Sequence, residues 1–486
     1  MIKLNQKFNR PPYLEILSEG QIYAIHSASL EILERTGMKC NNEAAIKIFQ
    51  EGGAYVEGDR VKIPPVMVEQ ALKSAPSRSL VTGRHGNGRV LLERNVVNYG
   101  LGTDVPNHID TYTHEIRPSV LKDIENIGKV VQKCENIDFT SNSGIASDVR
   151  PELQDLYHYK VGNTYCDKPF LTSAANGENM KALIDMATVF AGSYENLRKT
   201  PSLIVYGEPV SPLAFDKDAT DVLLVCAEYE IPIVFPPMVQ TGATGPMTLA
   251  GGIAQGNAET LASLVLHQLK SPGAPFIWGP FVSQMDMKTT ICTYGGPVFI
   301  KAQAALGQIS RFYNIPTFGF ACCTDSSVVD VQCGIEMLWS ILINALAGLN
   351  LCHDIGYLNS GLLFSLESLL LADEVISAVN HFMDGIEVNE ETLATDLINK
   401  VGPEGNFLME EHTLRFLRKE GWYPRFLNRK NYEAWKAAGC KTVNQRLEEK
   451  VHQIIEEDIP PQISEDEMKE LDKIIAGQEK KLGLRA

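Results

Sequence analysis

Polar and aromatic side chains that could do chemistry follow directly after the short apolar segment Asn350–Cys352. His353, Asp354 and Tyr357 supply an imidazole, a carboxylate and a phenol, and Gly356 allows close approach of the backbone. At the C-terminal end of a buried parallel strand, such side chains indicate an active site. We expect His353 and Tyr357 to be catalytic, although a lone histidine is also common as a core residue.

The elements that must position these residues recur along the chain as short apolar segments between stretches of helical periodicity. Eight strands are expected, at Val96–Tyr99, Ile137–Thr140, Phe170–Thr172, Leu203–Tyr206, Ile231–Phe235, Pro275–Trp278, Thr317–Phe320 and Asn350–Cys352. Eight βα repeats within roughly 250 to 310 residues match a closed (β/α)8 TIM barrel. An open doubly wound sheet is the alternative, but no G-x-G-x-x-G follows any of these segments. The sequence therefore predicts an α/β fold with a TIM barrel.

The chain of 486 residues exceeds a bare barrel, and the surplus lies at both ends. Residues 1–90 are expected to form an N-terminal α/β extension, and residues 401–486 a C-terminal helical extension. Residues 91–400 would form the barrel, with Ser119 as the cap of the helix before the second strand. The last segment, Ile463–Lys481, is either a surface helix or an arm that grips another subunit.

Composition excludes several classes of partner. A net charge of −16 argues against nucleic acid, whose phosphates require a basic surface. The first residues, Met1–Gln6, lack the apolar core of a signal peptide, and the longest apolar run, Met337–Cys352, is interrupted by polar residues. We expect a cytoplasmic protein with no membrane contact, ten reduced cysteines and a homodimeric or larger assembly.

Many segments resemble, in order, those of the trimethylamine methyltransferase superfamily, the corrinoid-dependent methyltransferases of anaerobes. They are Ile32–Met38, Gly53–Ala54, Val61–Pro65, Ala71–Leu72, Gly242–Gly251, Asn257–Glu259, Tyr294–Pro297, Asp325–Ser326, Asp330–Gln332, Asn344–Gly348, Asn359–Gly361 and Asp373–Glu374. The resemblance covers nearly the whole chain. It implies a barrel that passes a methyl group to the cobalt of a corrinoid.

The founding members of this superfamily carry pyrrolysine, which appears nowhere in this sequence. The resemblance is thus to the non-pyrrolysine branch, whose members demethylate quaternary amines such as glycine betaine, proline betaine and carnitine. It implies that glycine betaine is the methyl donor and cob(I)alamin the acceptor. The chain also lacks the D-x-H-x-x-G motif whose histidine ligates cobalt, so the corrinoid is expected on a cognate partner protein.

A quaternary ammonium is commonly held by cation–π contact with aromatic rings. The aromatic cage candidates at or after strand ends are Tyr99, Trp278, Phe320, Tyr357 and Phe364. Polar or close-approach contacts to the substrate are expected from Asp104, Asn142 and Gly356, and His353 would bond the substrate carboxylate. Core packing is the alternative for each single aromatic residue.

Two other functions stay open. The pair Cys322–Cys323 raises the possibility of a zinc-dependent thiol methyltransferase. No Cys-x-x-Cys or His-x-Cys spacing supports a metal site, however. Cys333, Cys352 and His353 would have to converge on the pair, so we expect no metal bound by this chain. A betaine-binding protein without catalytic activity is the third possibility.

Overall fold

Eight short parallel strands lie where the sequence predicts them. The structure is a computed structural model that describes residues 12–86 and 88–484, so Met1–Gln6 lies outside the described residues. The eight strands are β6 (Asn98–Tyr99), β9 (Thr140–Ser141), β10 (Phe170–Ser173), β11 (Leu203–Tyr206), β13 (Ile233–Val234), β15 (Phe276–Ile277), β17 (Phe318–Phe320) and β18 (Leu351–His353).

The eight strands pair in parallel as two sheets. Their strand orders are β15-β13-β11-β10-β9 and β17-β18-β6. Single parallel bridges, Gly100↔Phe139 and Trp278↔Thr317, connect the edges of the two sheets. At the second bridge, Trp278 donates its amide to Pro316 at 2.8 Å and accepts from Phe318 at 2.7 Å. The fold is therefore mixed α/β, with its two parallel sheets in contact at both edges.

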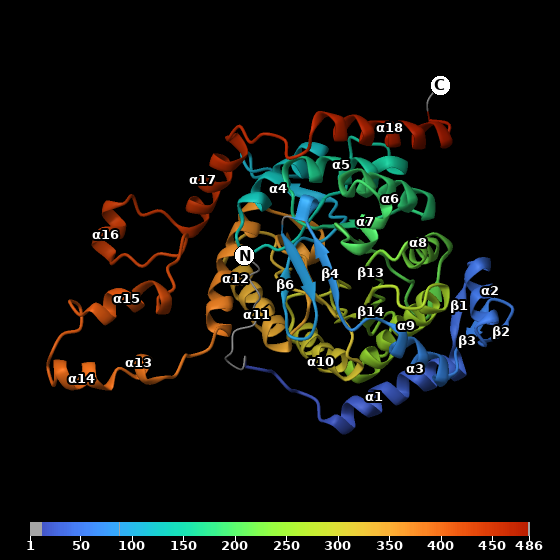
Figure 1. The fold of residues 1–486 in the computed structure, drawn as a ribbon, viewed down its shortest axis with the longest axis horizontal. Coiled ribbons are helices and arrows are strands. Elements are labelled where there is room, and N and C mark those ends of the chain that lie inside the picture. Colours follow the sequence, from blue (N-terminus) through green and yellow to red (C-terminus); the bar gives the residue numbers. More distant parts are fainter. Residues whose placement is uncertain (1–11, 87, 485–486) are drawn as a thin grey trace.

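A long helix follows each strand and covers the sheets from outside (Figure 1). These helices are α4 (Leu121–Lys133), α5 (Gln154–Tyr165), α6 (Gly177–Ala191), α8 (Lys217–Glu228), α9 (Leu249–Lys270), α10 (Pro297–Tyr313), α11 (Val331–Ala347) and α12 (Leu366–Met383). The predicted cap of α4 is wrong by one residue, because Val120 is the N-cap and Asp123 accepts its amide at 2.9 Å. Ser119 instead donates its hydroxyl to the Val105 carbonyl at 3.3 Å.

The N-terminal elements pack mainly against α9. They are α1 (Glu19–Glu31), a π-helical turn (Ile32–Thr36), β1 (Met38–Cys40), α2 (Glu43–Glu51), the antiparallel hairpin β2 (Tyr55–Glu57) and β3 (Arg60–Lys62), and α3 (Pro65–Ser74). Ser29 of α1 donates its hydroxyl to the Ala254 carbonyl at 2.8 Å and accepts from Asn257 at 2.9 Å. A short strand pair, β4 (Ser79–Thr82) and β5 (Arg89–Leu92), leads into β6.

The C-terminal region begins with a segment that projects from the body (Figure 1). We call residues 384–442 the arm; it contains α13 (Glu390–Leu393), α14 (Thr395–Val401), α15 (Glu411–Glu420) and α16 (Tyr432–Ala437). The chain then returns through α17 (Val443–Glu456) to α18 (Glu465–Lys481). Leu471 and Ile475 of α18 are buried, and Gln478 donates to Asn179 of α6 at 2.9 Å. The last helix thus packs on its own subunit.

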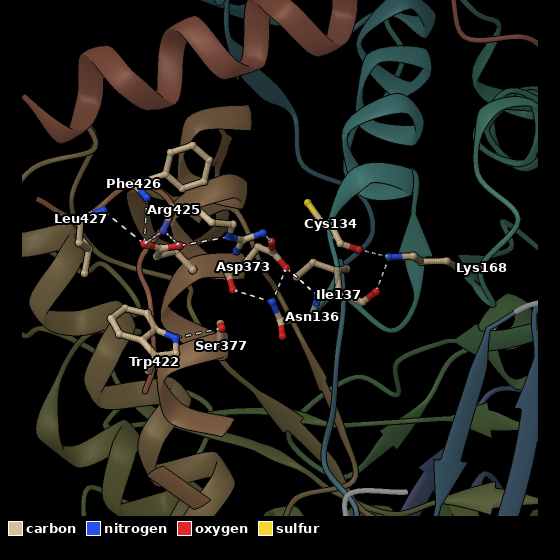
Figure 2. Close-up of polar contacts among 11 residues, drawn as sticks. Cys134, Asn136, Ile137, Lys168, Asp373, Ser377, Trp422, Arg425, Phe426 and Leu427 are labelled. Atoms are coloured by element: carbon tan, nitrogen blue, oxygen red, sulfur yellow. Dashed lines mark hydrogen bonds and ion pairs between the residues drawn. The ribbon is translucent and has the colours of Figure 1, made fainter. Parts of the chain in front are cut away.

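Two adjacent carboxylates of α12 fasten the returning chain (Figure 2). The Glu374 carboxylate accepts the backbone amides of Arg425, Phe426 and Leu427 at 2.9, 3.0 and 3.2 Å. Asp373 accepts the Asn136 amide at 2.7 Å and lies 2.6 Å from an Arg425 guanidinium nitrogen. Both carboxylates are buried, so their charges are compensated inside the protein.

No helix within the described ranges is long and apolar enough to cross a membrane. The cysteines are free thiols, and all except Cys292 and Cys440 are buried.

Candidate functional site

Four residues with a strained backbone lie where four of the parallel strands end. Asp104, Ser143, Cys322 and Asp354 follow β6, β9, β17 and β18, and their φ angles are 63°, 41°, 74° and 77°. Left-handed backbone at residues other than glycine is unfavourable and is common at ligand-binding sites. The same edge of the fold carries the side chains described below.

Three aromatic rings surround the imidazole of His353. Its ring centroid lies 4.3 Å from that of Phe318, 4.7 Å from Phe320 and 5.5 Å from Tyr206. Phe318 and Phe320 meet it edge to face, at 81° and 87°. Alternate residues of β17 and β18 thus point to one face, as the two-residue period of a strand requires. These rings form an aromatic wall that could contact an organic cation.

His353 also contacts the carboxylate of its neighbour. Nδ1 lies 2.6 Å from Oδ1 of Asp354, and both side chains are buried. Nδ1 makes no hydrogen bond of regular geometry among the described residues, so its close partner is the Asp354 carboxylate. A Cβ atom on Gly102 would lie 2.5 Å from Asp354 Oδ1 and 2.5 Å from the Tyr357 hydroxyl. Only glycine therefore fits beside this carboxylate.

A second carboxylate, Glu208, reaches the same group from β11. The Tyr206 hydroxyl donates to Glu208 Oε1. Burial raises the pKa of Glu208, as do the nearby charges of Asp104 and Asp354, while Tyr206 and His353 act in the opposite direction. Glu208 is half-buried and Asp104 is exposed, so both carboxylates retain contact with solvent. Glu208 was not among the expected site residues, because Glu208–Pro209 also fits the start of a loop.

Two further tyrosines border the cluster. Burial and then the charge of Asp354 raise the pKa of Tyr294 and of Tyr357, so both phenols stay protonated. Tyr357 donates its hydroxyl to the Thr103 carbonyl at 2.6 Å. The Tyr294 ring packs on Phe281 at 5.1 Å. Tyr294 was not among the expected site residues.

The loop that carries Tyr294 is held by a carboxylate from the next βα unit. Asp325 accepts the amides of Tyr294 and Gly295 at 2.8 and 3.0 Å, and the Ser360 hydroxyl at 2.8 Å. Glu336 in turn accepts the Asp325 amide at 2.8 Å. Three separate segments that carried the family resemblance, around residues 294, 325 and 360, thus meet in one polar network.

The structure brings together several of the expected site residues. His353, Tyr357 and Phe320 belong to the cluster, and Asp104 acts electrostatically on Glu208 and Tyr357. Asn142 lies at the end of β9, where it donates to the Gly144 carbonyl at 2.9 Å and contacts His158 Nδ1 at 3.3 Å. The Asn142 amide group is therefore already bonded to other groups of the protein.

Of the other expected residues, Tyr99 and Trp278 lie elsewhere, and Phe364 borders the cluster, with its ring 6.1 Å from that of Tyr357. The Tyr99 hydroxyl donates to the Ile341 carbonyl of α11 at 3.2 Å, so the ring packs between strand and helix. Trp278 is buried against Tyr313 of α10, with ring centroids 5.7 Å apart. Phe364, on β20 (Leu363–Phe364), stacks on His108 at 5.1 Å, and it fills the space where Gly356 would carry a Cβ atom, 2.6 Å away.

No group of three or more His, Cys, Asp or Glu side chains in the described ranges could hold a metal ion. Burial raises the pKa of the thiols of Cys322 and Cys323. The Cys352 thiol points to Asn344 of α11, 3.5 Å away, on the opposite side of β18 from His353. This arrangement gives no support to the zinc alternative, which requires converging thiolates.

The cluster combines negative charge with aromatic surface. Besides burial, the charges of three carboxylates, Asp104, Glu208 and Asp354, raise the pKa of tyrosines in the cluster. The rings of these tyrosines, together with Phe318 and Phe320, supply the aromatic surface. Carboxylates attract a positive charge over several ångströms, and ring faces hold it at short range.

Known proteins resemble this chain over nearly its whole length. The family model "Trimethylamine methyltransferase (MTTB)" matches residues 2–483. Trimethylamine methyltransferase MttB of Desulfitobacterium hafniense (strain DSM 10664 / DCB-2) is 32% identical over 472 residues, which are 96% of this chain and 94% of that protein. Glycine betaine methyltransferase of D. hafniense (strain Y51) is 30% identical over 484 residues, 97% of this chain and 98% of that protein.

Among solved structures, the monomethylamine methyltransferase MtmB of Methanosarcina barkeri aligns with a TM-score of 0.48 and 12% identity. The alignment covers 95% of this chain and 94% of that one.

Proposed function

Because the chain belongs to the trimethylamine methyltransferase family, we propose that it transfers a methyl group from a small quaternary amine to the cobalt of a partner corrinoid protein. The observation that carries the proposal is the aromatic wall around His353 together with the carboxylates of Glu208 and Asp354. The proposal covers simple cations and zwitterionic betaines such as glycine betaine alike.

The physical argument starts from the leaving group. A quaternary nitrogen already carries its positive charge and departs as a neutral tertiary amine, so it needs neither a general acid nor a special electrophile. Trimethylamine has no such charge and would need activation. We propose that this chain carries no pyrrolysine that could provide it. Catalysis then depends on aiming one methyl group at the nucleophile and on excluding water.

The residues of the cluster would divide this work. Tyr206, which is half-buried, would hold the methylated nitrogen through its ring face, and the buried rings of Phe318 and Phe320 would pack behind it. Asp354 and Glu208 balance its charge, and His353 keeps Asp354 in place by direct contact. No proton transfer is needed at any of these atoms.

The corrinoid would arrive on a partner protein. The chain contains no D-x-H-x-x-G segment, and the side chains at the strand ends are rings and carboxylates, which suit the amine rather than cobalt. When bound, the corrinoid supplies the cobalt(I) nucleophile. We propose that the eight parallel strands act as a (β/α)8 barrel whose strand ends face this partner.

The test is incubation of the purified protein with free cob(I)alamin and single amines, followed by the absorbance of methylcobalamin. We expect turnover with at least one quaternary amine and none with trimethylamine. Comparable turnover of trimethylamine would refute the quaternary-amine assignment. Ligand binding without any methylcobalamin would point to the binding-protein alternative.

We also propose a cytoplasmic homo-oligomer in which the arm contacts a second copy. The arm exposes large apolar side chains, among them Ile386, Leu408, Met409 and Leu414, at 82%, 78%, 95% and 76% of their surface. Exposed apolar patches commonly mark protein interfaces. Light scattering after gel filtration should give a mass of at least twice 53.7 kDa, and deletion of the arm should reduce it.

A further inference from the structure

We propose that the methyl donor is a quaternary ammonium cation without a carboxylate, such as a choline-like compound, rather than a zwitterionic betaine. This inference rests on the proposed function and specifies the charge of its substrate. It follows from the signs of the charges that face the aromatic wall.

The first observation is the concentration of negative charge. Besides burial, the charges of Glu208 and Asp354 raise the pKa of Tyr206 and of Tyr294. Besides burial, the charge of Asp104 raises the pKa of Glu208 and of Tyr357. These three carboxylates come from the ends of three strands that are distant in sequence, β6, β11 and β18. The fold therefore brings like charges together around one group of rings, which is unfavourable unless a cation separates them.

The second observation is the nature of the remaining groups. Among the described residues, no lysine or arginine forms an ion pair with Asp104, Glu208 or Asp354; Glu208 accepts from the Tyr206 hydroxyl, and Asp354 lies against His353. A buried substrate carboxylate needs a cationic or hydrogen-bonding partner, as an arginine would provide.

The third observation is the position of the imidazole. His353 is 4% exposed, and its Nδ1 lies 2.6 Å from Oδ1 of Asp354. This nitrogen is therefore engaged with a carboxylate of the protein, and a substrate carboxylate near it would also meet the charge of Asp354 at short range. The hydroxyl of a choline-like compound is neutral and meets no such repulsion.

In the reaction, one C–N bond breaks and its electron pair stays on nitrogen, which leaves as a neutral tertiary amine. The methyl carbon forms its new bond with an electron pair of cobalt(I), which the partner's corrinoid supplies. The carboxylates of the site neither gain nor lose protons.

Choline and glycine betaine form a matched pair for the test, because they differ only in a CH₂OH group against a carboxylate. We would measure kcat/KM with cob(I)alamin for both, and their affinities by calorimetry without corrinoid. The inference predicts at least a tenfold preference for choline in both measurements. Asp354→Asn and Glu208→Gln should shrink this preference, and Glu387→Gln on the arm, which pairs with exposed Lys419, should leave it unchanged.

Equal or better binding of glycine betaine would overturn the inference even if methyl transfer occurs. Preferential binding of choline without any methyl transfer would support the charge assignment while contradicting the proposed function. Binding of neither compound would overturn the inference. A betaine bound through a protonated Glu208 would keep its affinity in Glu208→Gln, whereas a bound cation would lose it.

Discussion

The side chains of His353 and Asp354 touch, with Nδ1 and Oδ1 2.6 Å apart, although the two residues are neighbours in the chain. Neighbours on an extended strand point to opposite faces, so such a contact requires the strand to end between them. The left-handed φ of 77° at Asp354 provides that end and turns the carboxylate back onto the imidazole. The strain at Asp354 therefore positions a charge beside the aromatic wall.

Asp354→Asn removes this charge while keeping the shape and hydrogen-bonding capacity of the side chain. We expect the KM for a quaternary amine to rise roughly 10- to 150-fold, because an interaction with a charged group contributes about 1.5–3 kcal/mol. Steady-state kinetics checks this, with a thermal melt on the same preparation. A lowered melting temperature with an unchanged KM would assign Asp354 a structural role only.

Tyr206 allows the ring and the hydroxyl to be tested separately. Tyr206→Phe removes only the hydrogen bond to Glu208, so we expect a change in KM of a few-fold at most. Tyr206→Ala also removes the ring, and the loss of a desolvated cation–π contact of about 2 kcal/mol should raise KM roughly 30-fold. Similar KM values for the two variants would exclude the ring as a binding surface.

The raised pKa of Glu208 predicts a pH dependence. Burial is the main cause of the shift, and a bound cation would favour the charged carboxylate. Cation affinity should therefore increase as pH rises through the pKa of Glu208, which lies above the ordinary value near 4.5. Calorimetric titrations from acidic to neutral pH measure this increase. In Glu208→Gln the increase should be smaller; an identical pH profile would remove Glu208 from the site.

The same shift has the opposite consequence for the unliganded protein. Because the folded-state pKa of Glu208 is raised, its neutral form favours the folded state at low pH. That contribution is lost as pH rises through the folded-state pKa. Glu208→Gln, which stays neutral, should therefore be slightly more stable than the parent at neutral pH without ligand. Urea unfolding at neutral pH tests this sign.

Glu374→Gln should loosen the returning chain between the arm and α17. The carboxylate accepts three backbone amides, and hydrogen bonds to a charged group contribute about 1.5–3 kcal/mol each. We expect a loss of about 3 kcal/mol in the free energy of unfolding. Glu387→Gln removes an exposed ion pair with Lys419 and should change stability by less than about 1 kcal/mol. Equal effects of the two substitutions would contradict the fastening role of Glu374.

Metal analysis of the purified protein should give far less than one zinc per chain. The thiols of Cys322 and Cys323 have raised pKa values, which disfavour the thiolate that zinc needs. Full zinc occupancy, together with activity that is lost on chelation and restored by zinc, would favour the thiol methyltransferase alternative.

Much of the fold could be predicted because its signals are local. Apolar runs bounded by glycine, proline and polar residues marked all eight strands, and helical spacing marked the helices between them. The sequence also predicted that His353 and Asp354 lie at the end of a strand, and the structure confirms this. The helix expected at Ile463–Lys481 is present as α18. The sequence left open whether it is a surface helix or an arm that grips another subunit, and in the structure it packs on α6 of its own chain.

The sequence by itself determined which residues stand at strand ends and which chemical groups they carry. Only the tertiary structure decided which of them meet. The two-residue period of a strand sends Phe320 toward His353 and Tyr99 toward α11, and a shift of one residue would exchange these faces. Glu208 joins Asp354 from 146 positions away in the chain, through the pairing order of the strands. Local patterns hold no information on such pairings, because their energy comes from burial and charge shared between distant segments.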